Sequence, residues 1–177
     1  MNYATIKWTD IANGEGVRIS LFVSGCTHHC KNCFNQVAWD FNYGKPFTLD
    51  VENAIIKSLN DEFIDGLSLL GGEPFEKKNQ KVLLPFLQKV KSLYPNKPIW
   101  CYTGYIFETD LLSKSGRAYT SDTLKMLSLI DVLVDGPFIE EQKNISLRFK
   151  GSENQRIIDV NKSLKQNETV LFEIEKY

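Results

Sequence analysis

Short apolar runs that each end close to a glycine recur along this chain. Runs of this length and composition, bounded by turn residues, are typical of buried β-strands. In the first run, Ile19, Leu21 and Val23 alternate toward one side. We therefore predict four strands, over residues 17–24, 67–70, 99–102 and 131–134.

Apolar residues at helical spacing fill the intervals between these strands. The first helix is predicted to begin at Thr48 or Asp50, which are both good N-cap residues. Pro85 falls inside the second helix, where it is expected to cause a kink. The last extended run, residues 169–174, is either an edge strand or a tail that docks elsewhere. The three helices are predicted over residues 50–63, 78–94 and 120–130.

Strands that alternate with helices predict an α/β fold with a mainly parallel sheet. Right-handed crossovers would curl such a sheet into an open or partial barrel. The carboxyl ends of parallel strands share one edge, and ligands of α/β proteins bind there. We therefore expect the turns after Ser24, Leu70 and Tyr102 to lie together on one rim.

The length of 177 residues fits one domain with a sizeable core, so we expect a single domain over residues 1–177. Lys and Arg total 21 against 22 Asp and Glu, a balance that argues against nucleic acid or a polybasic membrane contact. No apolar run reaches the roughly 20 residues that cross a bilayer. The N-terminal segment lacks the order of a signal peptide, so we expect a cytoplasmic protein with reduced cysteines.

Three of the four cysteines, Cys26, Cys30 and Cys33, lie within eight residues of one another. Thiolates are soft ligands that suit iron–sulfur clusters and zinc. A [4Fe–4S] cluster has four irons to ligate. Three grouped cysteines therefore leave one iron open, which is useful if another molecule binds there.

Two other interpretations of the cysteines remain open. One is a zinc site of the Cys3His type, with His28 or His29 as the fourth ligand. Structural zinc sites usually draw their ligands from two separated pairs, whereas these candidates crowd into one loop. The other is a disulfide, which the reducing cytoplasm disfavours.

The spacing Cys26-x3-Cys30-x2-Cys33 after a first strand, with a Gly71-Gly72-Glu73-Pro74 turn after the second, resembles the radical S-adenosylmethionine (SAM) superfamily. Further stretches resemble, more narrowly, the family of activating proteins of anaerobic ribonucleoside-triphosphate reductase. These stretches are residues 13–18, 21–26, 71–74, 100–105, 132–136, 148–152 and 154–158. The resemblance runs from about residue 3 to about residue 160.

This resemblance implies an open, partial (βα) barrel of the radical SAM type. It implies a [4Fe–4S] cluster on the three cysteines and SAM on the open iron, with reductive cleavage of SAM to methionine and a 5′-deoxyadenosyl radical. The radical would take hydrogen from a glycine of the large subunit of anaerobic ribonucleoside-triphosphate reductase. A flavodoxin-like or other low-potential electron donor is the second implied partner.

The same resemblance implies which residues contact SAM. Because Gly71 and Gly72 lack a Cβ, their backbone carbonyls could approach the SAM amino group. The alternative interpretation is that the two glycines only form an ordinary turn between a strand and a helix. Many superfamily members place an aromatic residue just before the third cysteine, against the adenine. Here Asn32 holds that position and Phe34 follows the cysteine, so Asn32 would use its amide or its backbone. The expected SAM contacts are Asn32, Cys33, Phe34, Gly71, Gly72 and Glu73.

Several other residues allow two interpretations each. Cys101 lies in an apolar strand, where a lone cysteine is usually a small buried hydrophobe rather than a ligand. Tyr105, in the Thr103-Gly104-Tyr105 turn, either lines the SAM pocket or packs in the core. Asp135 either orients a substrate-side pocket or caps a turn. The basic residues Arg148, Lys150 and Arg156 either hold a carboxylate or form a solvated surface.

Two alternatives to an activating enzyme remain at this point. One is a radical SAM enzyme that acts on a small molecule, such as the ring-contracting synthase of deazapurine biosynthesis. The segments 135–138 and 154–157 argue against that family. The other alternative is a non-catalytic zinc or iron–sulfur interaction module.

Overall fold

A single sheet of seven strands organises the computed structural model, which describes residues 1–174. The spatial order is β3-β1-β2-β4-β5-β6-β7. The strands are β1 (Asn2–Asp10), β2 (Arg18–Val23), β3 (Lys45–Pro46), β4 (Gly66–Gly71), β5 (Ile99–Tyr102), β6 (Val132–Asp135) and β7 (Arg156–Asp159).

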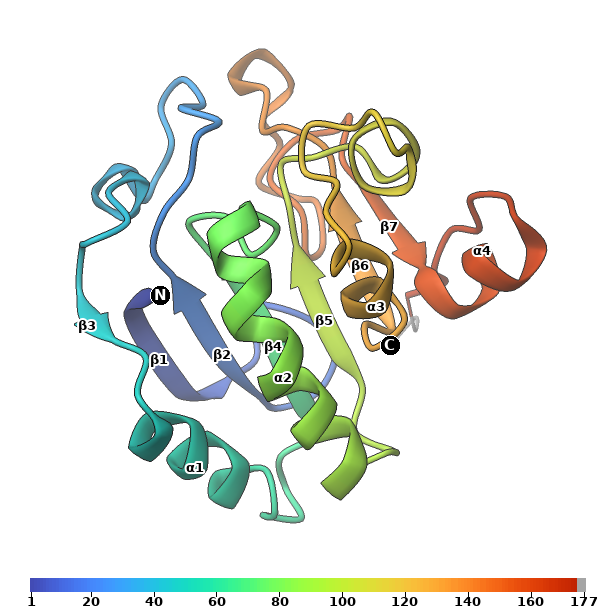
Figure 1. Cartoon of the computed structure of the whole chain (residues 1–177). Helices are drawn as coiled ribbons and strands as arrows, with labels where there is room; N and C mark the ends of the chain where they lie inside the picture. Colours follow the sequence, from blue (N-terminus) through green and yellow to red (C-terminus); the bar gives the residue numbers. More distant parts are fainter. Residues whose placement is uncertain (175–177) are drawn as a thin grey trace.

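The middle of the sheet is parallel, as the sequence predicts. β2 pairs with β4, β4 with β5 and β5 with β6 in parallel, and Arg18 lies opposite Gly66 at the start of the first pair. The strands at both edges, β1, β3 and β7, pair antiparallel. Within residues 1–174 the sheet is open, with β3 and β7 at its two ends (Figure 1). The mixed α/β class and the parallel centre are thereby confirmed.

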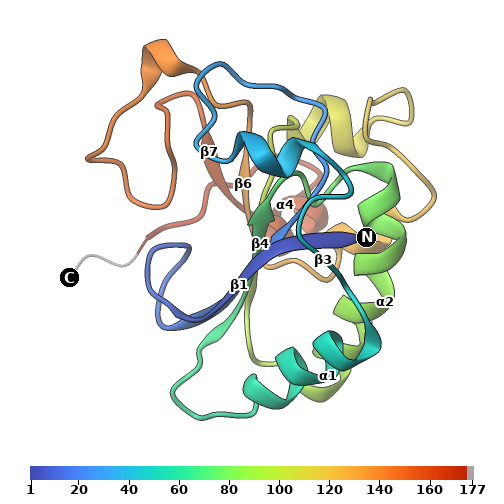
Figure 2. The same cartoon turned by 90° about the vertical axis from the view of Figure 1, so that its left-hand side faces the viewer.

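The helices are α1 (Leu49–Ser58), α2 (Lys77–Leu93), α3 (Thr123–Leu127) and α4 (Val160–Gln166), with 3-10 turns η1 (Gln36–Trp39) and η3 (Glu140–Gln142) and a π-helical turn η2 (Phe107–Leu112). α1, α2 and α3 lie on one face of the sheet (Figures 1 and 2). Within residues 1–174, no helix is long and apolar enough to cross a bilayer.

The alternation within the strands produces two apolar layers. Ile19, Leu21 and Val23 of β2 face the helices and join the main core, as their spacing predicts. The opposite face carries a smaller cluster in which Trp100 of β5 packs edge-on against the rings of Phe149 and Phe172. Burial of both faces explains why the central strands are continuous apolar runs.

The helix boundaries differ in part from those expected. Thr48 caps α1, accepting a bond from Val51 N at 3.4 Å, but the helix stops at Ser58 and Phe63 is exposed. α3 is only five residues long, because the side chain of Thr120 caps the turn that precedes it. Pro85 lies inside α2 on its exposed side, where a carbonyl that lacks its helical partner can bond to water.

The C-terminal run is a docked tail rather than an edge strand. Phe172 N donates to Ile157 O at 2.8 Å, and the ring centroids of Phe172 and Trp100 are 5.5 Å apart. Its pairing with β7 is limited to one isolated bridge, between Leu171 and Ile158.

Candidate metal centre

Four loops meet at the carboxyl end of the parallel strands. Gly72 N, after β4, donates to Val23 O at 2.7 Å, and Glu73 N donates to Gly25 O at 2.8 Å. Thr103 N, after β5, donates to Val134 O at 2.9 Å. The expected rim is therefore confirmed: the cysteine loop (residues 25–35) and the turns at residues 71–74 and 103–105 lie together.

Glycine is required where these loops approach most closely. Gly25 has a φ of 96°, and a Cβ there would lie 2.2 Å from the ring of Phe41. A Cβ on Gly72 would lie 2.6 Å from Gly25 O and 2.9 Å from Ala38 O. The contact between the turn at residues 71–74 and the cysteine loop thus depends on the missing side chain of Gly72.

The three clustered cysteines are free thiols on one tight loop. Cys26 is buried at the end of β2, while Cys30 and Cys33 are partly exposed. The loop reverses direction through His29 and Asn32, which have φ values of 50° and 55°. Cys33 N donates to Cys30 O at 3.1 Å, and this turn keeps the second and third thiols close. The three thiols are thus in the reduced form that a metal centre requires.

Burial controls the acidity of these thiols. It raises the pKa of Cys26 to about 12, and the nearby carboxylates of Glu73 and Glu76 also raise it. Burial raises the pKa of Cys30 as well. A soft metal centre binds the thiolate and releases the proton, so the free energy of metal binding has to offset these elevated pKa values.

The histidines of the loop are held by other partners. His28 Nε2 lies 2.9 Å from Glu73 Oε2, and its ring centroid is 4.3 Å from that of Tyr105. His29 packs against Trp39, with 4.5 Å between ring centroids. In the described residues, 1–174, no group of three or more His, Cys, Asp or Glu side chains surrounds a single metal position. The remaining donor set is three thiols, and this set fits a cluster in which each thiolate ligates its own iron.

Glu73 is the most heavily bonded residue of the rim. Its Oε1 accepts from Phe75 N at 2.8 Å and from Thr103 Oγ1 at 2.9 Å. Its Oε2 accepts from Gly104 N at 2.8 Å and contacts His28. The side chain is 1% exposed. The family resemblance predicts Glu73 as a SAM contact, but the sequence does not reveal that its carboxylate joins three loops.

Asn32 and Phe34, the other expected SAM contacts of the loop, have exposed side chains, and Phe34 is 87% exposed. Cys33, which lies between them, is partly buried. Asn35 N donates to Cys33 Sγ at 3.4 Å. In this part of the loop, Cys33 is thus less exposed than the two residues beside it.

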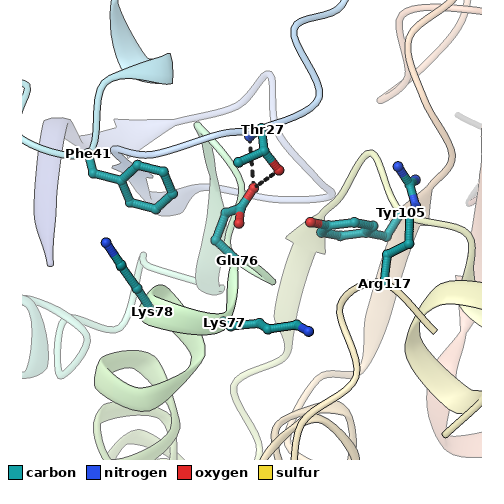
Figure 3. A pocket seen from close by; sticks show the side chains of 7 residues that line it. All are labelled: Thr27, Phe41, Glu76, Lys77, Lys78, Tyr105 and Arg117. Carbon is teal, nitrogen blue, oxygen red and sulfur yellow. Dashed lines mark hydrogen bonds between the residues drawn. The ribbon is translucent and has the colours of Figure 1, made fainter. Parts of the chain in front are cut away.

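A pocket of about 460 Å³ borders the loop on the side of α2 (Figure 3). Glu76 N-caps α2 by position, and its Oε1 accepts from Thr27 N at 2.8 Å and from Thr27 Oγ1 at 2.6 Å. The pocket is not evident from the sequence, although the acidic residue that follows the turn at residues 71–74 could have drawn attention to it. Its lining consists of Thr27, Phe41, Glu76, Lys77, Lys78, Tyr105 and Arg117.

Cys101 is buried in the core, and Arg156 and Lys150 are bonded to other groups of the protein. Cys101 is 0% exposed within the helix-facing core, and this confirms it as a buried hydrophobe. Arg156 pairs with Glu108 and Asp135, while Lys150 donates to backbone carbonyls at 2.8 and 3.3 Å. The expectation of a basic cluster free to hold an external carboxylate is therefore wrong for Arg156. Asp135 ties β6 to η2 through Phe107 N, which lies 2.9 Å from its Oδ2.

Comparison with known proteins agrees with this donor set. The family model described as "4Fe-4S single cluster domain" matches residues 12–158. The fold and the cysteine loop thus define a protein of the single-cluster iron–sulfur class.

Curated relatives narrow the class. A protein of Haemophilus influenzae named "Anaerobic ribonucleoside-triphosphate reductase-activating protein" is 49% identical over 159 residues, which cover 89% of this chain and 97% of that protein. Proteins of the same name from Escherichia coli strain K12 and Enterobacteria phage T4 are 41% and 36% identical, over 88% and 89% of this chain and 96% and 93% of their own lengths. The chain belongs to the family of anaerobic ribonucleoside-triphosphate reductase-activating proteins.

Proposed function

We propose that this protein is a radical SAM activating enzyme that generates a glycyl radical on anaerobic ribonucleoside-triphosphate reductase. The observation that carries the proposal is the loop at the end of β2, where three free thiols lie on the rim that also holds the turns after β4 and β5. Family membership over nearly nine-tenths of the chain supports the same activity.

In this proposal Cys26, Cys30 and Cys33 ligate a [4Fe–4S] cluster, and SAM binds the fourth iron. When bound and reduced, such a cluster would supply the one electron needed to cleave SAM to methionine and a 5′-deoxyadenosyl radical. The protein orients these groups and keeps water from them. We assign the SAM contacts to Asn32, Cys33, Phe34, Gly71, Gly72 and Glu73, with the turn at residues 71–73 acting through its backbone.

The proposed scaffold is a single radical SAM domain over residues 1–177, of which 175–177 lie outside the described residues. Its open sheet would correspond to the partial barrel of that superfamily. The support is that one sheet includes strands from Asn2 to Asp159. The protein would work in the cytoplasm, where thiols stay reduced.

The proposed partners are the large subunit of the reductase and a flavodoxin-like or other low-potential electron donor. The reductase would bring its own glycine loop to the rim, because hydrogen abstraction requires the reacting atoms to be held in contact. The printed names of the relatives support the first partner.

The first test is analysis of anaerobically purified protein for iron and sulfide, followed by reduction in the presence of SAM. About four irons and four sulfides per chain, with release of 5′-deoxyadenosine, is the expected result. Zinc without sulfide would contradict the proposal. Turnover of a small metabolite without any radical on an added reductase would replace the activase with a small-molecule radical SAM enzyme.

A further inference from the structure

Two buried carboxylates hold the residues that follow Cys26. Glu76 Oε1 accepts from both the backbone N and the hydroxyl of Thr27, at 2.8 and 2.6 Å (Figure 3). Glu73 Oε2 lies 2.9 Å from His28 Nε2. Glu73 is 1% exposed and Glu76 8% exposed, so both carboxylates are buried. The first half of the cysteine loop is thus attached to the turn that leads into α2.

The acceptor capacity of Glu73 is already filled. A carboxylate has about four lone-pair sites. The four protein donors are Phe75 N, Thr103 Oγ1, Gly104 N and His28 Nε2, two on each oxygen. A SAM ammonium group could reach this carboxylate only by displacing one of them, which would leave a buried donor without a partner.

Packing contacts, in addition to the hydrogen bond with Glu73, hold the His28 side chain in place. Its side chain is 7% exposed. Its ring lies against that of Tyr105, and a Cβ on Gly104 would lie 2.7 Å from it. The middle of the Cys26–Cys30 segment therefore fits into a space formed by the turns after β4 and β5.

An ion pair at the surface attaches the second half of the loop. Lys31 pairs with Glu141 at 2.9 Å, and both side chains are largely exposed, at 71% and 68%. An exposed pair of this kind contributes little to stability. The two halves of the loop therefore differ in how firmly the protein holds them.

We propose that Glu73 and Glu76 are positioning residues: through His28 and Thr27 they hold the Cys26–Cys30 segment in its ligand-presenting shape before any cluster is bound. In this role the Glu73 carboxylate does not contact SAM, and only the backbone of the turn is left for the cofactor. The inference rests on the proposed function, because it concerns the same three thiols.

The test compares iron release from the reconstituted holoprotein under a chelator. Glu73→Gln, Glu76→Gln and His28→Ala should each release iron about tenfold faster or more, the range found when partners that orient metal ligands are removed. His28→Gln, which keeps a donor, should recover part of the loss. The matched control is Glu141→Gln, which removes a carboxylate from the exposed half of the loop and should leave the release rate unchanged.

Two further readouts separate positioning from general destabilisation and from direct SAM binding. The double variant Glu73→Gln/His28→Ala should release iron more slowly than the product of the two single effects predicts, since both changes break the same Glu73–His28 contact. The electron paramagnetic resonance spectrum of the cluster should change in the same way in Glu73→Gln and in His28→Ala. The affinities of these two variants for SAM should be equal. Weaker SAM binding in Glu73→Gln alone would overturn the inference.

Amide hydrogen exchange of the metal-free protein tests the inference without a cluster. The Thr27 amide should exchange slowly in the unmodified chain and faster in Glu76→Gln, and the Gly104 amide should respond in the same way to Glu73→Gln. Unchanged exchange in the folded variants would contradict a preformed segment. If Glu73→Gln does not fold, His28→Ala tests whether Glu73 holds the segment through His28. If the unmodified protein takes up no iron, the proposed function fails and the exchange result still decides this inference.

Discussion

Arg156 of β7 donates two hydrogen bonds to the carboxylate of Glu108, at 2.9 and 2.8 Å, and two to that of Asp135, from Nε to Oδ1 at 3.0 Å and from Nη2 to Oδ2. The contact joins β7, η2 and β6 next to the rim. The hydrogen bond from Arg156 is the main reason why the pKa of Glu108 falls from 4.5 to about 2. Glu108 is therefore ionised across the physiological range.

The depressed pKa of Glu108 predicts a pH-dependent contribution to stability. A carboxyl group whose pKa is lower in the folded state stabilises the fold above its unfolded pKa, and this contribution is lost as the pH falls through the folded pKa. Because the group is partly exposed, Glu108→Gln should cost only about 1 kcal/mol at pH 7. The difference should shrink below pH 4.5 and disappear only below about pH 2.

Urea unfolding of both proteins across this pH range measures the effect. Glu62→Gln, at an exposed position after α1, is the control for removal of a surface carboxylate. A difference between Glu108→Gln and the unmodified chain that stays constant from pH 7 to pH 2 would contradict the assignment.

Arg18 connects the central strands at their amino-terminal ends, away from the rim. It is 1% exposed and donates to Ser68 Oγ at 2.8 Å and to the carbonyls of Leu67 and Pro98 at 2.8 and 2.6 Å. Burial lowers its pKa to about 10. Arg18→Lys leaves several buried carbonyls without donors and should cost about 3 kcal/mol. Thermal unfolding measures this loss, and an unchanged midpoint would show that Lys or water replaces the guanidinium.

The cluster should depend on three cysteines and not on the fourth. Replacement of Cys26, Cys30 or Cys33 by Ala should abolish stable cluster assembly, because two thiolates are too few to retain it. Cys101→Ala changes only the core, so iron content should stay full while stability falls by about 1 kcal/mol. Iron and sulfide analysis of the four variants decides, and a fully loaded Cys30→Ala protein would remove that residue from the ligand set.

Gly72→Ala tests the contact between the turn after β4 and the cysteine loop. The added methyl group would lie 2.6 Å from Gly25 O, so the two segments have to separate. We expect a loss of about 1–3 kcal/mol in unfolding free energy, together with faster iron release. Gly151→Ala is the control, since its Cβ would meet side chains rather than backbone: the ring of Phe138 at 3.3 Å and Gln155 Oε1 at 3.7 Å. Equal behaviour of the two variants would show that the turn does not need this approach.

The central strands and the rim could be predicted from the sequence because burial on both faces gives β2, β4, β5 and β6 an apolar composition that glycines interrupt. The edge strand β1 has largely exposed or half-buried side chains, so its sequence lacks a clear alternation. β7 is only four residues long, with two of them buried. The hydrophobic pattern of such strands is too weak to predict them from the sequence, because they form by pairing with a neighbouring strand.

The cysteine loop was evident for a similar reason: its three thiols are close in the chain. The bonds that hold it join residues far apart in sequence, such as His28 to Glu73 and Thr27 to Glu76. Arg156 likewise looked like a free cation until the fold brought Glu108 next to it. Contacts between residues that the fold of the sheet brings together cannot be predicted from the spacing of residues in the sequence.

The central claim is that a radical passes from SAM to a glycine of a separate protein. The most direct measurement is electron paramagnetic resonance after anaerobic incubation with SAM, reductant and an anaerobic ribonucleoside-triphosphate reductase, with 5′-deoxyadenosine measured in parallel. We expect a doublet typical of a glycyl radical on the reductase, accompanied by 5′-deoxyadenosine, and neither signal with Cys30→Ala. Cleavage of SAM by the loaded protein with no doublet on the reductase would contradict the activase function.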